Sequence, residues 1–278
     1  MKNYTVQIII PVYNSGKYLR RCLDSLIAQT FESWQALLID DGSTDDSAQI
    51  ISEYSANDVR FNYVRQNNSG VSVARNTALA MLDSEYTAFL DSDDYWEPDM
   101  LEVLYKASTE ENADVVQCRY MYDYPSGKQE IPKGAFDKNE ILEGKGLIKV
   151  YRKMMTGINM NHVCMKLVKT SLIGDLRFDT ALKTAEDLHF CVRLFKKVKK
   201  YCFINRPLYH YCRNESSITS KGLPFKEKLK ANIYVSKEMA RALPEFGIDS
   251  LFNRFLTYAR PYTIIISKAI RILREKLS

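Results

Sequence analysis

The sequence lacks a hydrophobic run long enough to cross a membrane as a helix, which takes roughly 18 apolar residues. It also lacks the apolar core of a secretory signal peptide, since no such stretch precedes Pro11. No CxxC pair occurs, and the spacing of the six cysteines suggests neither a zinc site nor a disulfide framework. These absences predict a cytoplasmic protein, in peripheral contact at most with the inner face of the plasma membrane.

Residues 1–250 have no excess of either charge sign, and only the end of the chain does. The formal net charge is +5, and residues 251–278 account for all of it, with six basic residues against one acidic residue. A neutral body argues against nucleic-acid binding, which needs a basic face or stripe. The basic residues of the tail alternate with apolar ones, so this segment either packs on the rest of the protein or lies on an anionic membrane.

The first half of the chain alternates between β-rich runs and segments with helical spacing of apolar residues. This alternation predicts an α/β fold with a mostly parallel sheet flanked by helices on both faces. Residues 119–150 contain several glycines and prolines, which predict an irregular region. A helical extension is expected near the C-terminus. The runs expected as strands are 6–12, 34–39, 61–64, 86–90 and 114–118.

Polar clusters follow three of these strands, at residues 13–15, 40–43 and 91–94. Ligands of parallel sheets bind beyond the carboxyl ends of the strands, so we expect these clusters to converge. The third cluster holds three aspartates within four residues, and a divalent cation would relieve their mutual repulsion. The alternative is a solvated acidic turn that caps the next helix.

Several sequence motifs follow one another along the chain. They are Ile8 to Asn14, Leu23 to Thr30, Asp40 to Asp45, Ala74 to Asn76, Leu90 to Asp94, and Glu186-Asp187. In this order they resemble the motifs of glycosyltransferase family 2, densely over the first third of the chain and sparsely over 160–215. The resemblance implies a GT-A, Rossmann-like fold, a nucleotide-diphosphate sugar donor with a UDP-sugar favoured, a Mn²⁺ or Mg²⁺ ion, and inversion at the anomeric carbon.

The resemblance also implies a division of the chain. Residues 1–118 would be the nucleotide-binding half and residues 119–220 the acceptor-binding half of one GT-A catalytic domain. Residues 221–278 would form a helical C-terminal extension. The acceptor would be a hydroxyl of a glycan or of a lipid-linked molecule, in the assembly of a bacterial surface polysaccharide.

On the donor side, the resemblance assigns roles by position. Pro11 and Tyr13 match the nucleoside pocket of the family. Asp40 matches the residue that accepts the uracil N3–H, and Arg75 matches an arginine near the nucleotide. A solvated helix arginine is the alternative for Arg75, although a fixed fork of donors suits phosphates.

For the acidic cluster, the resemblance assigns Asp91 and Ser92 to donor binding and both Asp91 and Asp93 to the metal. Which of Asp91, Asp93 and Asp94 contacts the ion directly stays open at this point. His210 is a further candidate metal ligand by resemblance, although a lone histidine is more often structural.

On the acceptor side, Asp187 matches the general base, with Glu186 supporting it. Two acids in a first helical turn are also favoured by the helix dipole, so a purely structural role is the alternative. Two other classes of function remain: a non-catalytic nucleotide-sugar binding module and a sugar nucleotidyltransferase. The second usually carries an early glycine-rich phosphate loop, whereas here Gly16 stands alone before Lys17.

Overall fold

The structure is a computed structural model that describes residues 4–156, 160–213 and 224–262. One mixed sheet runs through it in the order β3-β2-β1-β4-β9-β6-β10-β5, with β7 paired to β6 and β8 to β10. The strands are β1 (Val6–Val12), β2 (Trp34–Asp40), β3 (Phe61–Arg65), β4 (Tyr86–Phe89), β5 (Tyr95–Trp96), β6 (Val115–Asp123), β7 (Gln129–Glu130), β8 (Glu140–Glu143), β9 (Lys166–Lys169) and β10 (Lys200–Cys212). The labelled helices are α1 (Gly16–Ile27), α2 (Ser47–Asn57), α3 (Val71–Leu79), α4 (Met100–Glu110), η1 (Gly144–Leu147), α5 (Ile148–Thr156), α6 (Thr170–Ile173), α7 (Glu186–Phe195) and α9 (Phe225–Ala242), and a further helix covers 251–262.

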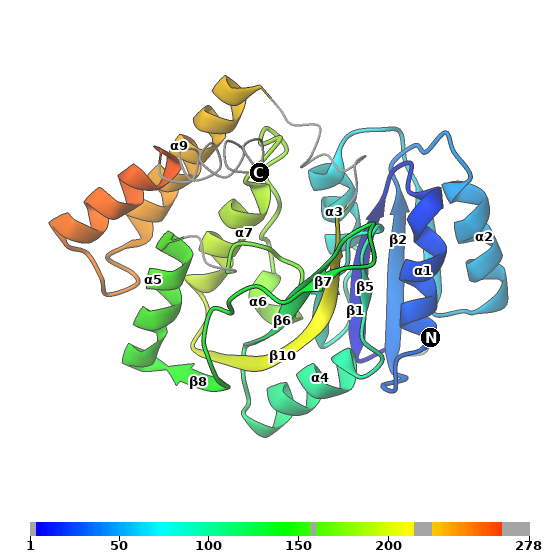
Figure 1. The fold of residues 1–278 in the computed structure, drawn as a ribbon, viewed down its shortest axis with the longest axis horizontal. Helices are drawn as coiled ribbons and strands as arrows, with labels where there is room; N and C mark the ends of the chain where they lie inside the picture. Colours follow the sequence, from blue (N-terminus) through cyan, green and yellow to red (C-terminus); the bar gives the residue numbers. More distant parts are fainter. Residues whose placement is uncertain (1–3, 157–159, 214–223, 263–278) are drawn as a thin grey trace.

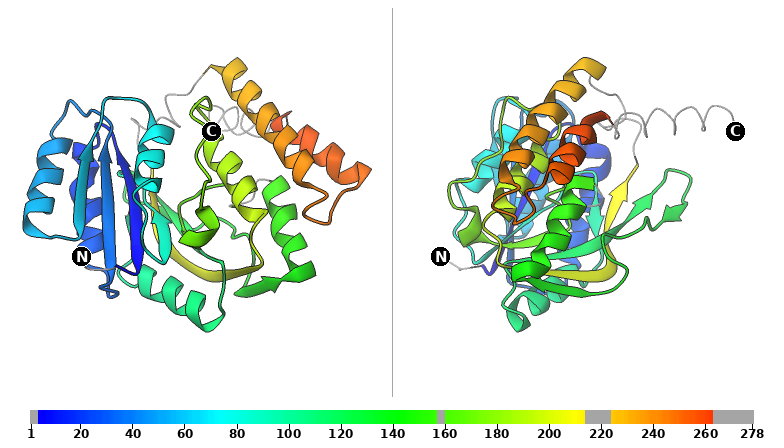
Figure 2. Two further views of the ribbon diagram at one scale, coloured as in Figure 1. Left: turned by 180° about the vertical axis from the view of Figure 1, so that it is seen from behind. Right: turned by 90° about the vertical axis from the view of Figure 1, so that its left-hand side faces the viewer.

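Strands β1 to β4 form the parallel part of the sheet. β1 pairs in parallel with β2 and β4, and β2 pairs in parallel with β3. β1 and β2 are buried along almost their whole length, as expected for strands covered on both faces. Helices α1 and α2 lie on one side of these strands and α3 lies on the other (Figures 1 and 2). The predicted α/β fold with a helix-flanked sheet is confirmed, and the parallel arrangement holds for β1 to β4 and for β6 with β10, whereas the other pairings are antiparallel.

The order of the strands reverses at β1. β2 and β3 lie on one side of it, whereas β4 lies on the other. The connections that leave β1 and β4 therefore diverge at the carboxyl ends of the two strands, and the crevice outside such a switch point is where ligands of these sheets bind. Residues 13–15 and 91–94 follow these two strands directly, so the topology places both at the crevice.

The region 119–150 is more regular than the sequence indicates. β6 continues to Asp123 because the long strand β10 pairs with it in parallel, and β8 pairs with the start of β10. β10 bends strongly along its length (Figure 1), with register shifts between Phe203 and Tyr209. The far edge of β10 then pairs with β5, the strand that follows the acidic cluster. A partner this distant in the sequence leaves no local signal, which is why the expectation of an irregular region was wrong for residues 119–123 and 140–150, whereas residues 131–139 are irregular as expected.

The described part of the C-terminal extension packs on the second half of the sheet domain. α9 lies against α7, and the Tyr151 ring of α5 stacks on Phe246 with centroids 3.9 Å apart. Lys196, just after α7, pairs with Glu245 at 2.6 Å between Nζ and Oε1. These contacts show that residues up to the middle of the extension belong to the folded body.

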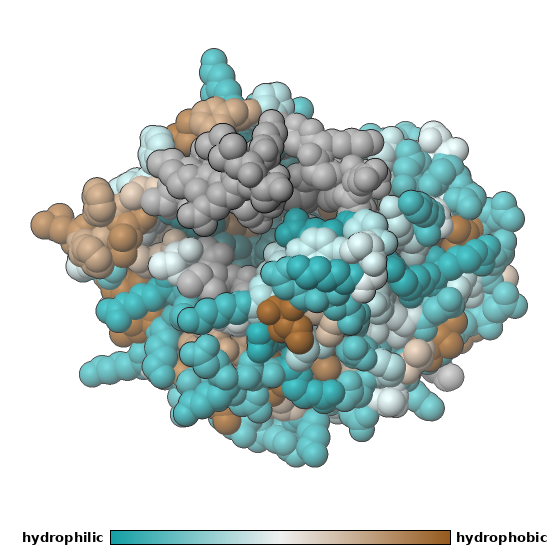
Figure 3. Space-filling model, in the orientation of Figure 1, coloured by the Kyte–Doolittle hydropathy of each residue, from teal (hydrophilic) through white to brown (hydrophobic). Residues whose placement is uncertain are grey.

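Helix 251–262 leaves an apolar face uncovered. Leu251, Phe252 and Phe255 are exposed, and they form a hydrophobic patch over this helix in Figure 3. Four of the six basic residues that give the chain its excess charge follow after residue 262 and lie outside the described residues. Across the described residues, no helix combines the length and the apolar character that a membrane crossing requires.

Candidate functional site

The three polar clusters meet at the carboxyl edge of the sheet, as predicted. The backbone N–H of Asn14 donates to Ser43 Oγ at 3.0 Å, and Asn14 Oδ1 accepts from the backbone N–H of Thr44 at 2.8 Å. Ser15 Oγ and Ser92 Oγ share a hydrogen bond of 2.7 Å. The loops after β1, β2 and β4 are therefore joined by direct hydrogen bonds into one surface.

The residues predicted to hold the nucleoside differ in their accessibility. Tyr13 is 48% exposed at the end of β1, in a position to meet a ligand. Asp40 is fully buried, because its carboxylate accepts from the backbone N–H of Ser43 at 2.8 Å and from Tyr63 Oη at 3.2 Å, and it faces Arg65 at 3.5 Å. The role of Asp40 at a base stays a prediction, and what the structure shows is a carboxylate that shapes the loop after β2.

The neighbouring Asp41 organises the start of α3. Its Oδ1 accepts from the backbone N–H of Ser69 at 2.9 Å, and its Oδ2 accepts from that of Gly70 at 2.7 Å. Gly70, the residue before α3, has φ of +93°, a conformation that glycine adopts without strain. The carboxylate thus fixes the turn that leads into α3, and α3 carries Arg75.

Arg75 joins the two acidic regions of the site. Its Nη2 donates to Asp91 Oδ1 at 3.0 Å, and its Nη1 donates to Asp187 Oδ1 at 2.8 Å and lies 3.6 Å from Glu186 Oε1. The side chain is only 4% exposed. Burial opposes its charge, but Asp187 and Asp91 outweigh that effect and raise the pKa of Arg75. One buried guanidinium therefore holds the acidic cluster beside the Glu186-Asp187 pair.

The Glu186-Asp187 pair opens helix α7. The preceding Ala185 is left-handed, with φ of +62°, a strained conformation for a residue with a Cβ. The backbone N–H of Val163 donates to Asp187 Oδ2 at 3.3 Å. Burial, reinforced by the charge of Asp187, raises the pKa of Glu186 to about 7. The pair therefore combines an anchored aspartate with a glutamate that takes up a proton near neutral pH.

The structure separates the three aspartates of the acidic cluster by environment. Asp94 is buried, and its carboxylate accepts from Tyr209 Oη at 2.6 Å and from the backbone N–H of Cys212 at 2.8 Å. Burial, followed by the charges of Asp93 and Asp91, raises the pKa of Asp94 well above its usual value. Asp91 and Asp93 are partly exposed at the crevice.

The oxygen ligands that Asp91 and Asp93 offer suit a hard divalent cation. Asp91 and Asp93 offer carboxylate oxygens, the ligands that Mg²⁺ and Mn²⁺ prefer. Over the ranges that the structure describes, no three histidine, cysteine, aspartate or glutamate side chains form a ready-made cluster for a metal. Mg²⁺ is commonly held by one or two carboxylates together with substrate phosphates, which is a set that these two aspartates can complete.

The His210 side chain is surrounded by two carboxylates and one aromatic ring. Its Nδ1 is 3.0 Å from Asp123 Oδ2 and its Nε2 is 2.9 Å from Glu97 Oε1. The Tyr95 ring stacks on the imidazole with centroids 4.0 Å apart. Both ring nitrogens are thus engaged with carboxylates in this arrangement, and metal ligation by His210 stays a prediction.

Two functional contacts near the site escaped sequence reasoning. The hydroxyl of Tyr209 binds Asp94, and the backbone N–H of Val163 binds Asp187. The alternate tyrosines Tyr209 and Tyr211 were a signal that could have found Tyr209, since every second residue of a strand shares a face. No local sequence signal marks Val163. Its loop is held in place by the buried Lys166, whose Nζ donates a hydrogen bond to the carbonyl of His162.

The sequence comparisons point to a single family. The family model described as Glycosyl transferase family 2 matches residues 7–177. Glycosyltransferase GlyA of Streptococcus pneumoniae serotype 4 is 34% identical over 224 residues, which cover 77% of this chain and 31% of GlyA. Poly(ribitol-phosphate) beta-N-acetylglucosaminyltransferase TarP of Staphylococcus aureus strain N315 is 32% identical over 203 residues, which cover 70% of this chain and 59% of TarP. The chain thus spans less than two thirds of the length of these relatives.

The solved structures show the same fold. Residues 1–349 of S. aureus TarS in complex with UDP-GlcNAc align with a TM-score of 0.70 and 23% identity, over 90% of this chain and 75% of that one. Mannosyltransferase PcManGT from Pyrobaculum calidifontis, in complex with GDP-Man and Mn²⁺, aligns with a TM-score of 0.63 and 17% identity, over 99% of this chain and 80% of that one. At these identities the likeness establishes the architecture.

Proposed function

We propose, from the premise that this chain belongs to glycosyltransferase family 2 and has its GT-A fold, that it transfers a sugar from a nucleotide-diphosphate sugar to a hydroxyl group, with inversion at the anomeric carbon. A UDP-sugar is the favoured donor, and the acceptor is a glycan or a lipid-linked molecule. The bound UDP-GlcNAc and GDP-Man of the structural neighbours support a nucleotide-sugar donor.

The observation that carries this proposal is the bridge made by Arg75. Transfer needs a site that neutralises the leaving diphosphate next to a base that deprotonates the acceptor. Arg75 contacts Asp91 on the first side and Asp187 on the second, although the two aspartates come from opposite halves of the catalytic domain. The two chemical requirements are therefore met within the reach of one side chain.

On the donor side, we assign Asp91 and Asp93 as the residues that would hold Mg²⁺ or Mn²⁺. A divalent cation held there would supply positive charge against the negative charge that develops on the leaving diphosphate. Ser92 would help to bind the donor, and Pro11 and the exposed ring of Tyr13 would face the nucleoside. Asp94 stays outside the ligand set, because Tyr209 and Cys212 occupy its oxygens.

On the acceptor side, Asp187 is the general base. Its carboxylate takes the proton of the acceptor hydroxyl while that oxygen forms a bond to the anomeric carbon of the donor. The bond from the anomeric carbon to the diphosphate oxygen breaks on the opposite face, so the configuration inverts. Hydrogen bonds from Arg75 and from the Val163 N–H fix the orientation of the carboxylate.

A screen of UDP- and GDP-sugars for metal-dependent donor hydrolysis tests the proposal. We expect a UDP-sugar to be hydrolysed in the presence of Mn²⁺ or Mg²⁺ and to be left intact after chelation with EDTA. Asp93→Ala should lower this rate by at least about 10²-fold, because it removes a carboxylate that holds the ion. Asp99→Ala is a matched control, since Asp99 lies just beyond the cluster and pairs with Arg206.

Other outcomes of the screen separate the competing functions. UDP binding with neither hydrolysis nor transfer would favour a non-catalytic nucleotide-sugar binding module. Pyrophosphate release from a nucleoside triphosphate and a sugar phosphate would favour a sugar nucleotidyltransferase. Hydrolysis that persists in Asp93→Ala would overturn the assignment of the metal site.

We also propose that the C-terminal extension contacts an anionic membrane surface through helix 251–262, beyond the part that packs on α7. The uncovered Leu251, Phe252 and Phe255 support an apolar contact, and the net positive charge of residues 251–278 supports attraction to such a surface. The protein should co-sediment with vesicles that contain anionic lipid and not with neutral vesicles. Phe252→Ser with Phe255→Ser should weaken this binding, and equal sedimentation with both kinds of vesicle would contradict it.

A further inference from the structure

A run of tyrosines extends outward from the acidic cluster along β6 and β10. In the parallel pairing of these strands, Tyr209 lies opposite Tyr120 and Tyr211 lies opposite Tyr122. Residues opposite each other in neighbouring strands point to the same face of a sheet, and so do residues two apart in one strand. Tyr209 donates to Asp94 on this face, so the tyrosines share a face with the candidate site.

The outer part of this run forms an ordered aromatic surface. The Tyr122 ring meets the Tyr211 ring edge-on at a centroid distance of 5.6 Å, and the Tyr124 ring lies 6.3 Å from Tyr122. The Arg213 guanidinium stacks over Tyr122 at 4.2 Å. These four side chains are all partly exposed, and we call them the tyrosine row.

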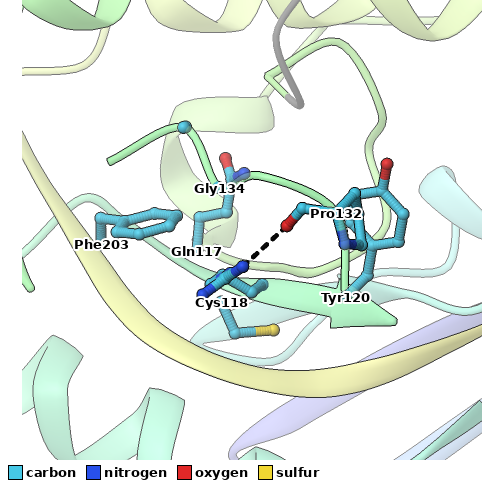
Figure 4. A pocket seen from close by; sticks show the side chains of 8 residues that line it. Gln117, Cys118, Tyr120, Pro132, Gly134 and Phe203 are labelled. Carbon is cyan, nitrogen blue, oxygen red and sulfur yellow. Dashed lines mark hydrogen bonds between the residues drawn. The ribbon is translucent and has the colours of Figure 1, made fainter. Parts of the chain in front are cut away.

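The inner end of the run is closed to ligands. Tyr120 is buried, and it lines a small pocket together with Pro132 and Gly134 (Figure 4). The Pro132 carbonyl is held there by Arg119, whose Nη2 donates to it at 2.7 Å. A ligand that leaves the crevice along this face therefore meets the tyrosine row and not Tyr120.

The chemistry of the tyrosine row suits a sugar chain. A pyranose ring has an apolar face of C–H groups that packs on an aromatic ring, and its hydroxyl groups need hydrogen-bond partners around the rim. Tyrosine offers both an apolar ring and a polar tip, with little side-chain entropy to lose. Arg213 adds N–H donors at the edge, and its buried Nε has no hydrogen-bond partner in the part of the chain that the structure describes.

We propose that the tyrosine row is an acceptor subsite that binds the sugar units next to the one that receives the transferred sugar. The inference rests on the proposed glycosyltransferase function and deepens it, because it makes the acceptor an oligosaccharide of at least two units. Tyr122 and Tyr124 stack on the sugar rings, and Arg213 donates to their hydroxyl oxygens. Affinity for an acceptor should therefore increase with the length of its chain.

An array of bacterial polysaccharide fragments, one to six sugars long and probed in the presence of UDP and Mn²⁺, tests the subsite. The amount of full-length protein bound to a fragment should increase with the length of that fragment. Tyr124→Ala and Tyr122→Leu should each weaken binding to fragments of three or more sugars by about 2- to 10-fold, the contribution of one aromatic contact. Tyr124→Phe should bind like the unchanged protein, because it keeps the ring and loses only the hydroxyl that contacts Glu130.

A matched control and a second measurement keep the outcomes distinct. Tyr234→Ala removes a more exposed tyrosine from α9 and should leave the array unchanged. Titration with UDP and Mn²⁺ should give one affinity for all variants, which also shows that they are folded. If the protein binds UDP but no fragment better with length, or if Tyr124→Ala binds like the unchanged protein, the subsite is overturned. Failure to bind UDP would instead overturn the proposed function.

Discussion

Replacing Asp187 with asparagine is expected to lower the turnover number of sugar transfer by about 10²- to 10⁴-fold, the usual contribution of a general base. Asparagine keeps the size of the side chain and its single oxygen can still accept a hydrogen bond from Arg75, but its NH2 group cannot accept from Val163 and the side chain cannot take the acceptor proton. The affinity for UDP should stay within about 2-fold, because the donor side of the site is untouched. Steady-state kinetics with the donor found by the hydrolysis screen, together with a UDP titration, would measure both quantities.

Two variants serve as controls for Asp187→Asn. Asp175→Asn makes the same chemical change at an exposed position in the same half of the domain and should leave turnover unchanged. Glu186→Gln alters the neighbour of the base and should reduce turnover less than Asp187→Asn. A turnover number for Asp187→Asn within about 10-fold of the unchanged protein would show that another group is the base.

Glu186→Gln should also change how the stability of the protein depends on pH. The pKa of Glu186 is raised to about 7 from an ordinary value of 4.5, so its contribution to stability is complete below pH 4.5 and is lost as pH increases through 7. The loss amounts to roughly 3 kcal/mol at pH 8. The unfolding midpoint of Glu186→Gln should therefore decline less between pH 5 and pH 8 than that of the unchanged protein.

Replacing Arg75 with methionine is expected to destabilise the protein by about 3 kcal/mol and to abolish transfer. The change leaves Asp91, Glu186 and Asp187 without the buried cation that joins them, and uncompensated charges of this kind are expensive. The estimate takes the low end of the usual range because Asp91 is 34% exposed and can recover hydration. For a chain of this size the loss lowers the unfolding midpoint by roughly 5 °C, which calorimetry would detect.

Arg20→Met is the matched control for Arg75→Met. Arg20 pairs with Glu53 at 2.6 Å, but both side chains are largely exposed, and such surface pairs contribute little to stability. Arg75→Lys separates charge from geometry, since a lysine keeps the charge but lacks the fork that reaches two carboxylates at once. It should recover part of the stability and little of the activity. An unfolding midpoint for Arg75→Met equal to that of Arg20→Met would show that the bridge has no structural role.

Prediction from the sequence succeeded where the signal was local. The alternation of strands and helices was enough for the α/β fold, because buried parallel strands and their covering helices each leave a pattern within a few residues. The convergence of residues 13–15, 40–43 and 91–94 followed from the same pattern, since parallel strands share a carboxyl edge. The same reasoning gave the wrong structure for residues 119–123, because this part of β6 forms a strand only by pairing with the distant β10.

The sequence by itself determined the fold class, the order of the motifs, and the acidic cluster at the end of a strand. Only the tertiary structure decided which carboxylates share a site. Arg75 and Asp187 are 112 positions apart, and no short-range pattern could show that α3 and α7 place them at 2.8 Å. The same holds for Asp94, which looks like its neighbours in the sequence and differs from them only because Tyr209 buries it. Local sequence encodes the elements, but long-range packing sets the distances, the burial and the pKa values on which the chemistry depends.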